Sequence, residues 1–372
     1  MSDANDTSSK VELPKSPDDV FAMKMMNVAC NALLSGAINL GIDLGLFEAL
    51  AKVGNKSQPA TAADVAKMSG TKERYCQEWL CSMACGDVIE MDETGKYFWI
   101  PEERVSMMTG ANPHIGFMMN MALSAYGASY KQLCNVIKLD GPLGMEYSAY
   151  GEFYKKVNFM SRAMHQKHLV KDLVPKLGMK EALSNGIKVL DVGCGSGFHA
   201  MELANHFPNS HFTGVDLGEE GIKNAQKEAA EKQLKNTSFL CANGNNLDSN
   251  WTEKFDLVLI FDACHDQTRP DLTLLEIHRC LKPEGLFAMI EVNGTGNCFT
   301  DKAKLGPVAA AMYGISLFHC LPVGSNSKDA LQLGALWGRE RAKSLMEAAG
   351  FKNVEIEEIP FYQFNILYKT KK

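Results

Sequence analysis

The chain has 372 residues, 46% of them hydrophobic, so it is long enough for two domains with sizeable cores. Its formal net charge of -6 argues against the clustered lysines and arginines that hold nucleic acids, and favours small or neutral partners. Eleven cysteines in so long a chain, with no apolar leader at its start, predict reduced thiols and a cytoplasmic protein.

The first 110 residues predict a flexible tail followed by a winged helix. Residues 1–17 are polar and contain the two earliest prolines, which is typical of a tail. Residues 18–110 show successive amphipathic helical patterns, and Thr61, with Asp64 three residues later, predicts a helix N-cap. The stretch "DVIEMDETGKYFWI" then alternates around a turn and predicts a hairpin. Polar residues within the apolar window 28–50 argue against a membrane span.

A winged helix also raises the possibility of DNA binding, which the charges disfavour. Residues 61–110 contain five basic and nine acidic side chains, a net charge of -4. Such a face would repel a phosphate backbone. We therefore expect this domain to form a homodimer or a lid, with DNA binding as the less favoured alternative.

Residues 111–183 predict a helical linker or lid, rich in methionine and tyrosine and broken by "DGPLG". Stripes of this kind are usually plain core. Their place between two predicted domains also suits a ligand pocket, so both interpretations stay open. The pocket candidates are Tyr147, Tyr150, Met160 and His165.

Residues 184–372 alternate between strand and helix patterns, which predicts an α/β domain with a doubly wound parallel sheet. Helical patterns cover 219–234 and 269–281. The seven expected strands cover 187–192, 210–216, 237–242, 255–261, 285–292, 353–359 and 364–370.

A glycine-rich loop follows the first of these strands, in "KVLDVGCGSG". Glycines there let a ligand touch the main chain, because no Cβ intervenes. The dinucleotide pattern G-x-G-x-x-G fails, since position 198 is Phe. The loop instead reads D-x-G-x-G-x-G over Asp191, Gly193, Gly195 and Gly197.

This D-x-G-x-G-x-G loop resembles motif I of class I S-adenosylmethionine-dependent methyltransferases. That cofactor has no phosphate, and an acid can accept its ammonium. A second acid, placed to accept two ribose hydroxyls, is expected at the end of the next strand. Asp216 stands there, nineteen residues beyond Gly197. Asn243 ends the third strand where the family usually has an acid, and its oxygen can still accept the adenine amino group.

The fourth strand ends in "FDACHDQTRPD", which aims Asp262, His265 and Asp266 at the site. Histidine titrates near neutrality and can take the proton of an acceptor, although a lone histidine is more often structural. This segment is similar to the His-Asp segment of caffeate-type and hydroxyindole-type O-methyltransferases. With "LFHCLPVG" and "LGALWGRERAKSLMEAAGF", it also resembles a poorly characterised group of methyltransferases that begin with a winged helix.

The resemblance implies a seven-stranded Rossmann-like methyltransferase domain after a winged-helix domain, and S-adenosyl-L-methionine as the cofactor. It implies His265 as the base, with Asp266 beside it. His319 could line the acceptor pocket, although buried core is the favoured interpretation. The cofactor contacts implied are Asp191, Gly193 and Gly195 for the methionine end, Asp216 and Leu217 for ribose and adenine, Asn243 and Gly244 for adenine, and Asp262 for the amine, with Gly197 and Ala263 as further cofactor-binding residues.

The leading hypothesis is methyl transfer to the oxygen or sulfur of a small molecule, and a thiol is attractive because it ionises near neutrality. A protein or RNA methyltransferase and a cofactor-sensing transcriptional regulator stay open as alternatives. No C-x-x-C pair supports a metal site, so none is expected.

Overall fold

The computed structural model describes residues 16–110, 127, 129–150, 162 and 165–372. The chain divides into two compact units, Met1–Leu123 and Ser124–Lys372, and the division falls inside the predicted linker. Part of that linker, including Met160, lies outside the described residues.

The first unit contains the expected helices and hairpin. Thr61 and Asp64 form a capping box at the start of one helix, and Gly70 ends that helix in the left-handed conformation. The apolar run after residue 20 forms two helices, because Gly45 turns the chain with φ 64°. Its described elements are α1 (Pro17–Asp43), α2 (Leu46–Val53), α3 (Ala62–Ser69), α4 (Glu73–Cys85), β1 (Glu90–Met91), β2 (Phe98–Trp99) and α5 (Glu102–Met108).

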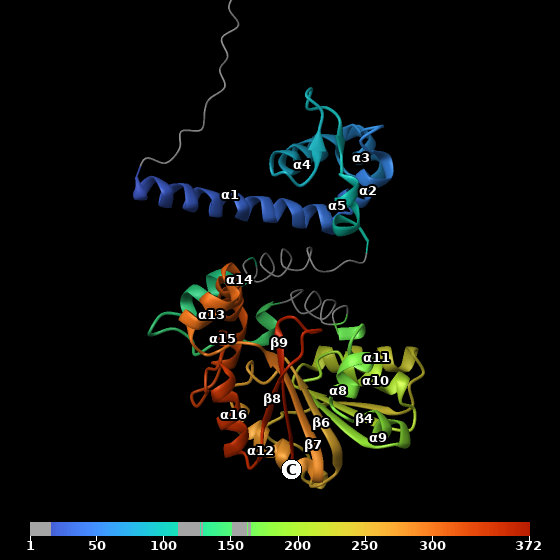
Figure 1. Cartoon of the computed structure of the whole chain (residues 1–372), viewed down its shortest axis with the longest axis vertical. Helices are drawn as coiled ribbons and strands as arrows, with labels where there is room; N and C mark the ends of the chain where they lie inside the picture. Colours follow the sequence, from blue (N-terminus) through green and yellow to red (C-terminus); the bar gives the residue numbers. More distant parts are fainter. Residues whose placement is uncertain (1–15, 111–126, 128, 151–161, 163–164) are drawn as a thin grey trace, which may run out of the picture. The chain divides into compact units, whose positions relative to one another are not determined.

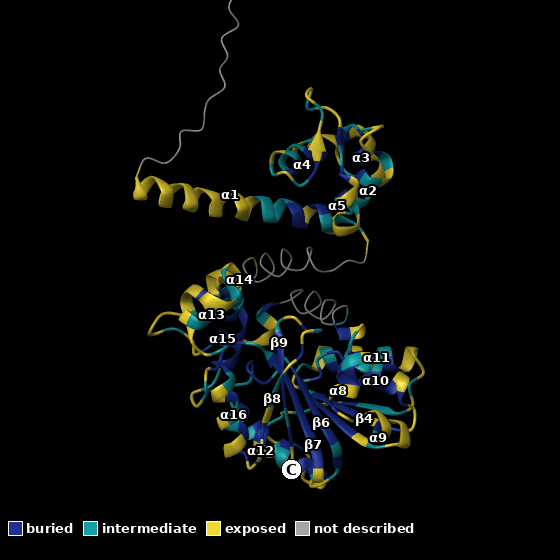
Figure 2. Cartoon of the chain, viewed as in Figure 1, coloured by how far each residue is buried: buried dark blue, intermediate teal, exposed yellow. Residues whose placement is uncertain are grey.

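Among the residues that the structure describes, two helical segments are long and apolar enough to cross a membrane by length and composition, Pro17–Asp43 and Pro307–Gly324, each with mean hydropathy 1.3. A core helix or a signal sequence meets the same criterion, so these segments are weak evidence for a membrane. Figure 2 shows the first half of α1 as exposed. Its large exposed side chains include Phe21 and Met26.

The second unit contains a seven-stranded sheet in the order β5-β4-β3-β6-β7-β9-β8. All seven predicted strands are present. The sheet is mixed rather than fully parallel, because β9 runs antiparallel to both of its neighbours. The loop from β8 to β9 is too short for a parallel crossover. The strands are β3 (Lys188–Val192), β4 (His211–Asp216), β5 (Thr237–Cys241), β6 (Phe255–Phe261), β7 (Leu281–Val292), β8 (Glu355–Glu358) and β9 (Asn365–Lys371).

Helices cover both faces of this sheet (Figure 1). On one face α10 (Phe198–His206) and α11 (Glu219–Glu231) bury residues such as Leu203 and Ala225. On the other face α12 (Pro270–Cys280) and α16 (Arg339–Ala348) bury residues such as Ile277 and Met346. Among the described residues, this unit also contains the short turns η1 (Tyr147–Tyr150), η2 (Leu169–Leu173) and η3 (Ser249–Trp251), the helices α8 (Val174–Lys176), α9 (Lys180–Asn185), α13 (Cys298–Leu305), α14 (Pro307–Ile315) and α15 (Leu321–Gly324), and the π-helical turn η4 (Ser316–Cys320).

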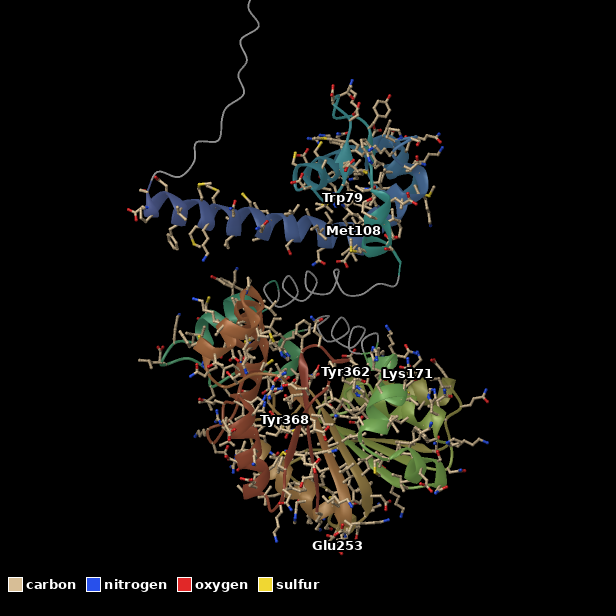
Figure 3. All side chains as sticks on the ribbon, in the orientation of Figure 1. Trp79, Met108, Lys171, Glu253, Tyr362 and Tyr368 are labelled. Atoms are coloured by element: carbon tan, nitrogen blue, oxygen red, sulfur yellow. The ribbon has the colours of Figure 1, made fainter. Side chains whose placement is uncertain are left out.

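The strand order sets the position of the site. The chain runs outward from β3 through β4 to β5 and then returns to the other side of β3 with β6. Ligands bind in the crevice at such a reversal, beyond the carboxyl ends of the strands. Figure 3 labels a residue at each end of this unit. Tyr362, in the loop before β9, lies at one end, and Glu253, in the loop before β6, lies at the other.

Candidate functional site

A cavity of about 250 Å³ lies at the carboxyl ends of β3, β4, β5 and β6. Eight of the residues predicted from the sequence line it together: Tyr147, Gly193, Asp216, Leu217, Asn243, Gly244, Ala263 and Asp266. Its other side is formed by Met145 and Glu146 before η1 and by Val323 and Asn326 near α15. The site therefore combines the strand ends with segments far from them in the sequence.

The loop after β3 has glycine at three positions whose backbone conformation favours that residue. Gly193, Gly195 and Gly197 have φ of 72°, 54° and 75°, a region that favours glycine. A Cβ on Gly193 would stand 2.5 Å from the Cβ of Ala263, across the cavity wall. The loop main chain is thus available to a ligand.

Asp216 ties this loop to the end of β4. Its carboxylate accepts the Gly195 N–H at 2.8 Å and the Gly218 N–H at 2.8 Å. Burial raises the pKa of Asp216, and the two N–H donors oppose that rise. Each oxygen keeps a second lone pair, so two vicinal hydroxyls of a ribose can donate to the same carboxylate.

Asp191, near the end of β3, is a buried acid. Its side chain is 2% exposed, and neither oxygen has a hydrogen-bond partner among the described residues. Burial, and then the charge of Asp216, raise the pKa of Asp191 to about 7. A buried carboxylate without a partner is costly, so this acid needs an explanation. The ammonium of S-adenosyl-L-methionine supplies one, because a cation beside Asp191 would offset its burial. The residues present fit that cofactor.

Asn243 and Gly244 line the cavity beyond β5, where the adenine is expected. The Asn243 side-chain oxygen accepts the N–H of Asn245 at 3.0 Å, which fixes the amide and leaves one lone pair for a ligand. Leu217 is 61% exposed beside Asp216 and offers an apolar surface to a base.

Asp262, at the end of β6, adopts φ 46°, an unusual value for a residue other than glycine. The Asn365 side chain donates to its Oδ1 at 2.6 Å. Burial and the charge of Glu291 raise the pKa of Asp262 to about 7. It stands next to Ala263, which lines the cavity, whereas Asp262 itself does not.

His265 is buried between two carboxylates. Its Nδ1 lies 2.6 Å from Glu291 Oε2, and its Nε2 lies 3.3 Å from Asp266 Oδ1. Burial alone would lower the pKa of His265, but the charges of Glu291 and Asp266 outweigh it and raise the pKa well above its usual value. Sequence reasoning missed Glu291. Glu291 could have been recognised because it is an acid within the apolar run of β7, and a buried acid needs a partner.

The remaining pocket candidates lie in two different places. Tyr150 is buried, donates to the Phe318 carbonyl at 3.0 Å, and packs edge-on against His319 with ring centroids 4.8 Å apart. Tyr147 also lies near His319, at 6.2 Å, and is the one of these three that lines the cavity.

His165 belongs to a separate buried cluster. Its Nδ1 lies 2.7 Å from His199 Nε2, and its ring is 4.5 Å from that of Tyr362. Burial lowers the pKa of His165 to about 4. It does not line the cavity.

Known protein families match both parts of the chain. Residues 31–110 match a family described as the Rv2258c-like winged HTH domain, and residues 183–316 match one described as a methyltransferase domain. A ubiquinone biosynthesis O-methyltransferase of Maricaulis maris is 29% identical over 41% of this chain and 59% of its own length. An S-adenosyl-L-methionine-dependent Diels-Alderase of Talaromyces variabilis is 26% identical over 48% of this chain and 57% of its own length. The chain thus spans less than two thirds of these relatives.

Solved structures share the fold over nearly the whole chain. A putative O-methyltransferase from Nostoc punctiforme covers 96% of this chain and 100% of its own, with a TM-score of 0.69 and 18% identity. Human N-acetylserotonin methyltransferase, solved with S-adenosylmethionine, covers 97% and 99%, with a TM-score of 0.64 and 15% identity. At sequence identities of 18% and 15%, these comparisons show a shared fold and nothing more. The chain therefore contains a methyltransferase domain behind a Rv2258c-like winged HTH domain, and it shares the fold of solved methyltransferases over nearly its whole length.

Proposed function

We propose that this protein transfers the methyl group of S-adenosyl-L-methionine to a small-molecule acceptor. The observation that carries the proposal concerns Asp191. This buried acid has no hydrogen-bond partner among the described residues, and it stands just before the glycine loop that borders the cavity. The cofactor supplies a methyl group on a positively charged sulfur, which is already activated for transfer. The task of the chain is then to hold the acceptor in line with that methyl group.

The surroundings of His265 favour a thiol as the acceptor. Both ring nitrogens face carboxylates, so the ring is held in its doubly protonated form. A histidine that already carries both protons does not take another from a hydroxyl. A thiol of pKa about 8.5 is partly ionised near neutrality and needs less help from a base. The positive charge of His265 would in addition stabilise the thiolate.

The lining of the cavity supports a small acceptor. Besides the residues expected to contact the cofactor, the cavity is lined by Met145, Glu146 and Tyr147. A protein or RNA substrate would need an open groove, and a regulator would not need an acceptor site. We propose Tyr147 as an acceptor contact, with Tyr150 and His319 behind it.

The direct test is an acceptor screen. Purified protein is incubated with methyl-labelled S-adenosyl-L-methionine and a panel of small thiols, phenols and amines, and products are identified by mass spectrometry. We expect label on the sulfur of a thiol. Calorimetry that finds no binding of the cofactor would contradict the whole proposal, whereas label on oxygen would contradict only the thiol class.

His265→Gln separates the two acceptor classes. In metal-free buffer at pH 9, above the ordinary pKa of a thiol, we expect thiol methylation to fall by no more than about tenfold, because the thiolate forms unaided. An oxygen acceptor that relied on His265 as a base would lose at least about a hundredfold in kcat. His206→Gln, at a half-exposed histidine on α10, is the matched control and should leave both rates unchanged.

We also propose a homodimer formed through the N-terminal domain. Large apolar side chains such as Phe21 and Met26 are 61% and 65% exposed on α1, and burying them would be favourable. Light scattering should give twice the chain mass for the protein, and Phe21→Asp with Met26→Asp should shift it toward the monomer. A monomeric mass for the unaltered protein at micromolar concentration would contradict this.

A further inference from the structure

His265 lies in a buried group of side chains that could together bind a metal ion. His265, Asp266 and Cys320 each offer one ligand atom, and these atoms all lie within 4.8 Å of one another. All three residues are buried, with exposures of 3%, 9% and 6%. A tetrahedral zinc ion with bonds of about 2.0 to 2.3 Å needs its ligands roughly 3.5 Å apart. Closing the group around an ion therefore takes side-chain movements of about an ångström.

Glu291 orients His265 as a metal-binding histidine requires. The bond from Nδ1 to Glu291 Oε2, at 2.6 Å, places a proton on Nδ1 and directs Nε2 at Asp266. A carboxylate behind a ligating imidazole fixes the tautomer and raises its basicity, which is the usual arrangement around zinc. Glu291 is itself held by the backbone N–H groups of Cys264 and His265, at 2.9 and 3.3 Å.

Cys320, the third of these ligands, lies at the end of the π-helical turn η4. This turn lies between α14 and α15, and π-helical turns within helices are frequent at functional sites. His319 Nδ1 lies 3.6 Å from Cys320 Sγ and 3.8 Å from Asp266 Oδ2, so it stands beside two of the three ligands. Helix α15, which follows the turn directly, is close to the loop after β6, since a Cβ on Gly324 would stand 3.1 Å from the His265 carbonyl oxygen.

We propose that His265 Nε2, an Asp266 carboxylate oxygen and Cys320 Sγ form a Zn²⁺ site whose fourth position binds the thiol of the acceptor. Three protein ligands with one open position are typical of catalytic zinc. Asp266 also lines the cavity, so the ion would border the space next to the cofactor site. The acceptor part of this inference rests on the proposed function.

The ion would stabilise the thiolate of the acceptor, as the protonated ring of His265 does when no ion is bound, and its charge is larger. A thiol bound to Zn²⁺ gives its proton to solvent and reacts as the thiolate. The sulfur lone pair forms the new bond to the methyl carbon, and the electron pair of the broken carbon–sulfur bond stays on the cofactor sulfur. The products are a methyl thioether and a neutral demethylated cofactor.

Metal binding by the full chain is the test. Metal-free protein is titrated with Zn²⁺ against a chromogenic chelator, and we expect one tight equivalent per chain. Cys320→Ser and Asp266→Asn should each weaken that site at least about a hundredfold, which is the upper range found for the loss of outer-shell partners alone. Cys280→Ser, at another fully buried cysteine of the same unit, should leave it unchanged. No tight equivalent, or equal binding by Cys320→Ser, would overturn the proposal.

Cobalt shows whether sulfur is a ligand and whether the fourth position is open. With Co²⁺ we expect a thiolate charge-transfer band that Cys320→Ser removes and Cys280→Ser keeps. Adding a simple alkyl thiol should strengthen the band, and an unchanged band would overturn acceptor binding at the metal. Calorimetry with S-adenosyl-L-methionine on each metal-free variant shows that it is folded. It also separates the two proposals, since cofactor binding without zinc binding would sink only this one.

Discussion

Asp216→Ala should reduce the affinity for S-adenosyl-L-methionine at least about a hundredfold. Two hydrogen bonds from the ribose to a charged acceptor are lost, at about 1.5 to 3 kcal/mol each. The substitution also releases the N–H groups of Gly195 and Gly218, which the same carboxylate holds at 2.8 Å. The loop would then no longer be fixed before the cofactor arrives. Titration calorimetry on the purified variant measures the change.

Asp256→Ala is the matched control for that experiment. Asp256 lies at the opposite end of the sheet, where it accepts the Lys188 N–H at 2.9 Å and the Lys282 ammonium at 2.7 Å. It therefore loses comparable bonds without touching the cavity. We expect it to lower the melting temperature and leave the cofactor affinity unchanged. If both variants bind the cofactor as tightly as the unaltered protein, Asp216 does not receive the ribose.

Asp191→Asn should weaken cofactor binding and flatten its dependence on pH. Removing one member of a buried charge pair costs about 2 to 5 kcal/mol, roughly 30-fold to several thousandfold. The pKa of Asp191 is raised to about 7 in the free protein, so its carboxylate forms as the pH increases toward 7. Over that range the affinity for a cation should increase by up to about tenfold for each unit by which the pH increases. Above roughly pH 8 it falls again, because the ammonium of the cofactor loses its proton.

The same calorimetric titrations between pH 5 and 9 check this prediction. The unaltered protein should give a maximum between about 7 and 8, and Asp191→Asn should lose most of the rise on the acid side. Asp262, with its pKa also raised to about 7, would leave a shallower residual slope. Asp301→Asn, at another buried acid, should keep the full profile. An unchanged profile in Asp191→Asn would place the ammonium elsewhere.

Local signals in the sequence were enough to predict the strands and the cofactor loop. The central strands carry apolar runs and β8 alternates apolar and acidic residues, and the glycines with Asp191 and Asp216 stand at fixed distances along one strand-helix-strand unit. Such patterns depend on neighbours in the chain. The direction of β9 also follows from a short connection, although the sequence pattern alone was interpreted as parallel.

Contacts between distant segments could not be predicted in this way. Glu291 reaches His265 from the neighbouring strand, and Asn365 reaches Asp262 from the last one. Cys320 joins the same group only because a π-helical turn packs against the loop after β6. Each pairing depends on how strands and helices are packed, and no periodicity along the chain records it. His165 shows the converse, since a residue of a plausible pocket segment is packed among His199 and Tyr362.

The raised pKa of Asp191 also means that the fold gives up stability where it receives its ligand. An unfolded aspartate ionises near pH 3.9, so the folded chain is progressively penalised as pH rises from about 4 to about 7. Selection for heat resistance alone would therefore tend to replace this acid with a neutral side chain and weaken uptake of the cofactor. Occupancy by the cofactor relieves the penalty, so scarcity of that metabolite would shorten the lifetime of the protein in a cell.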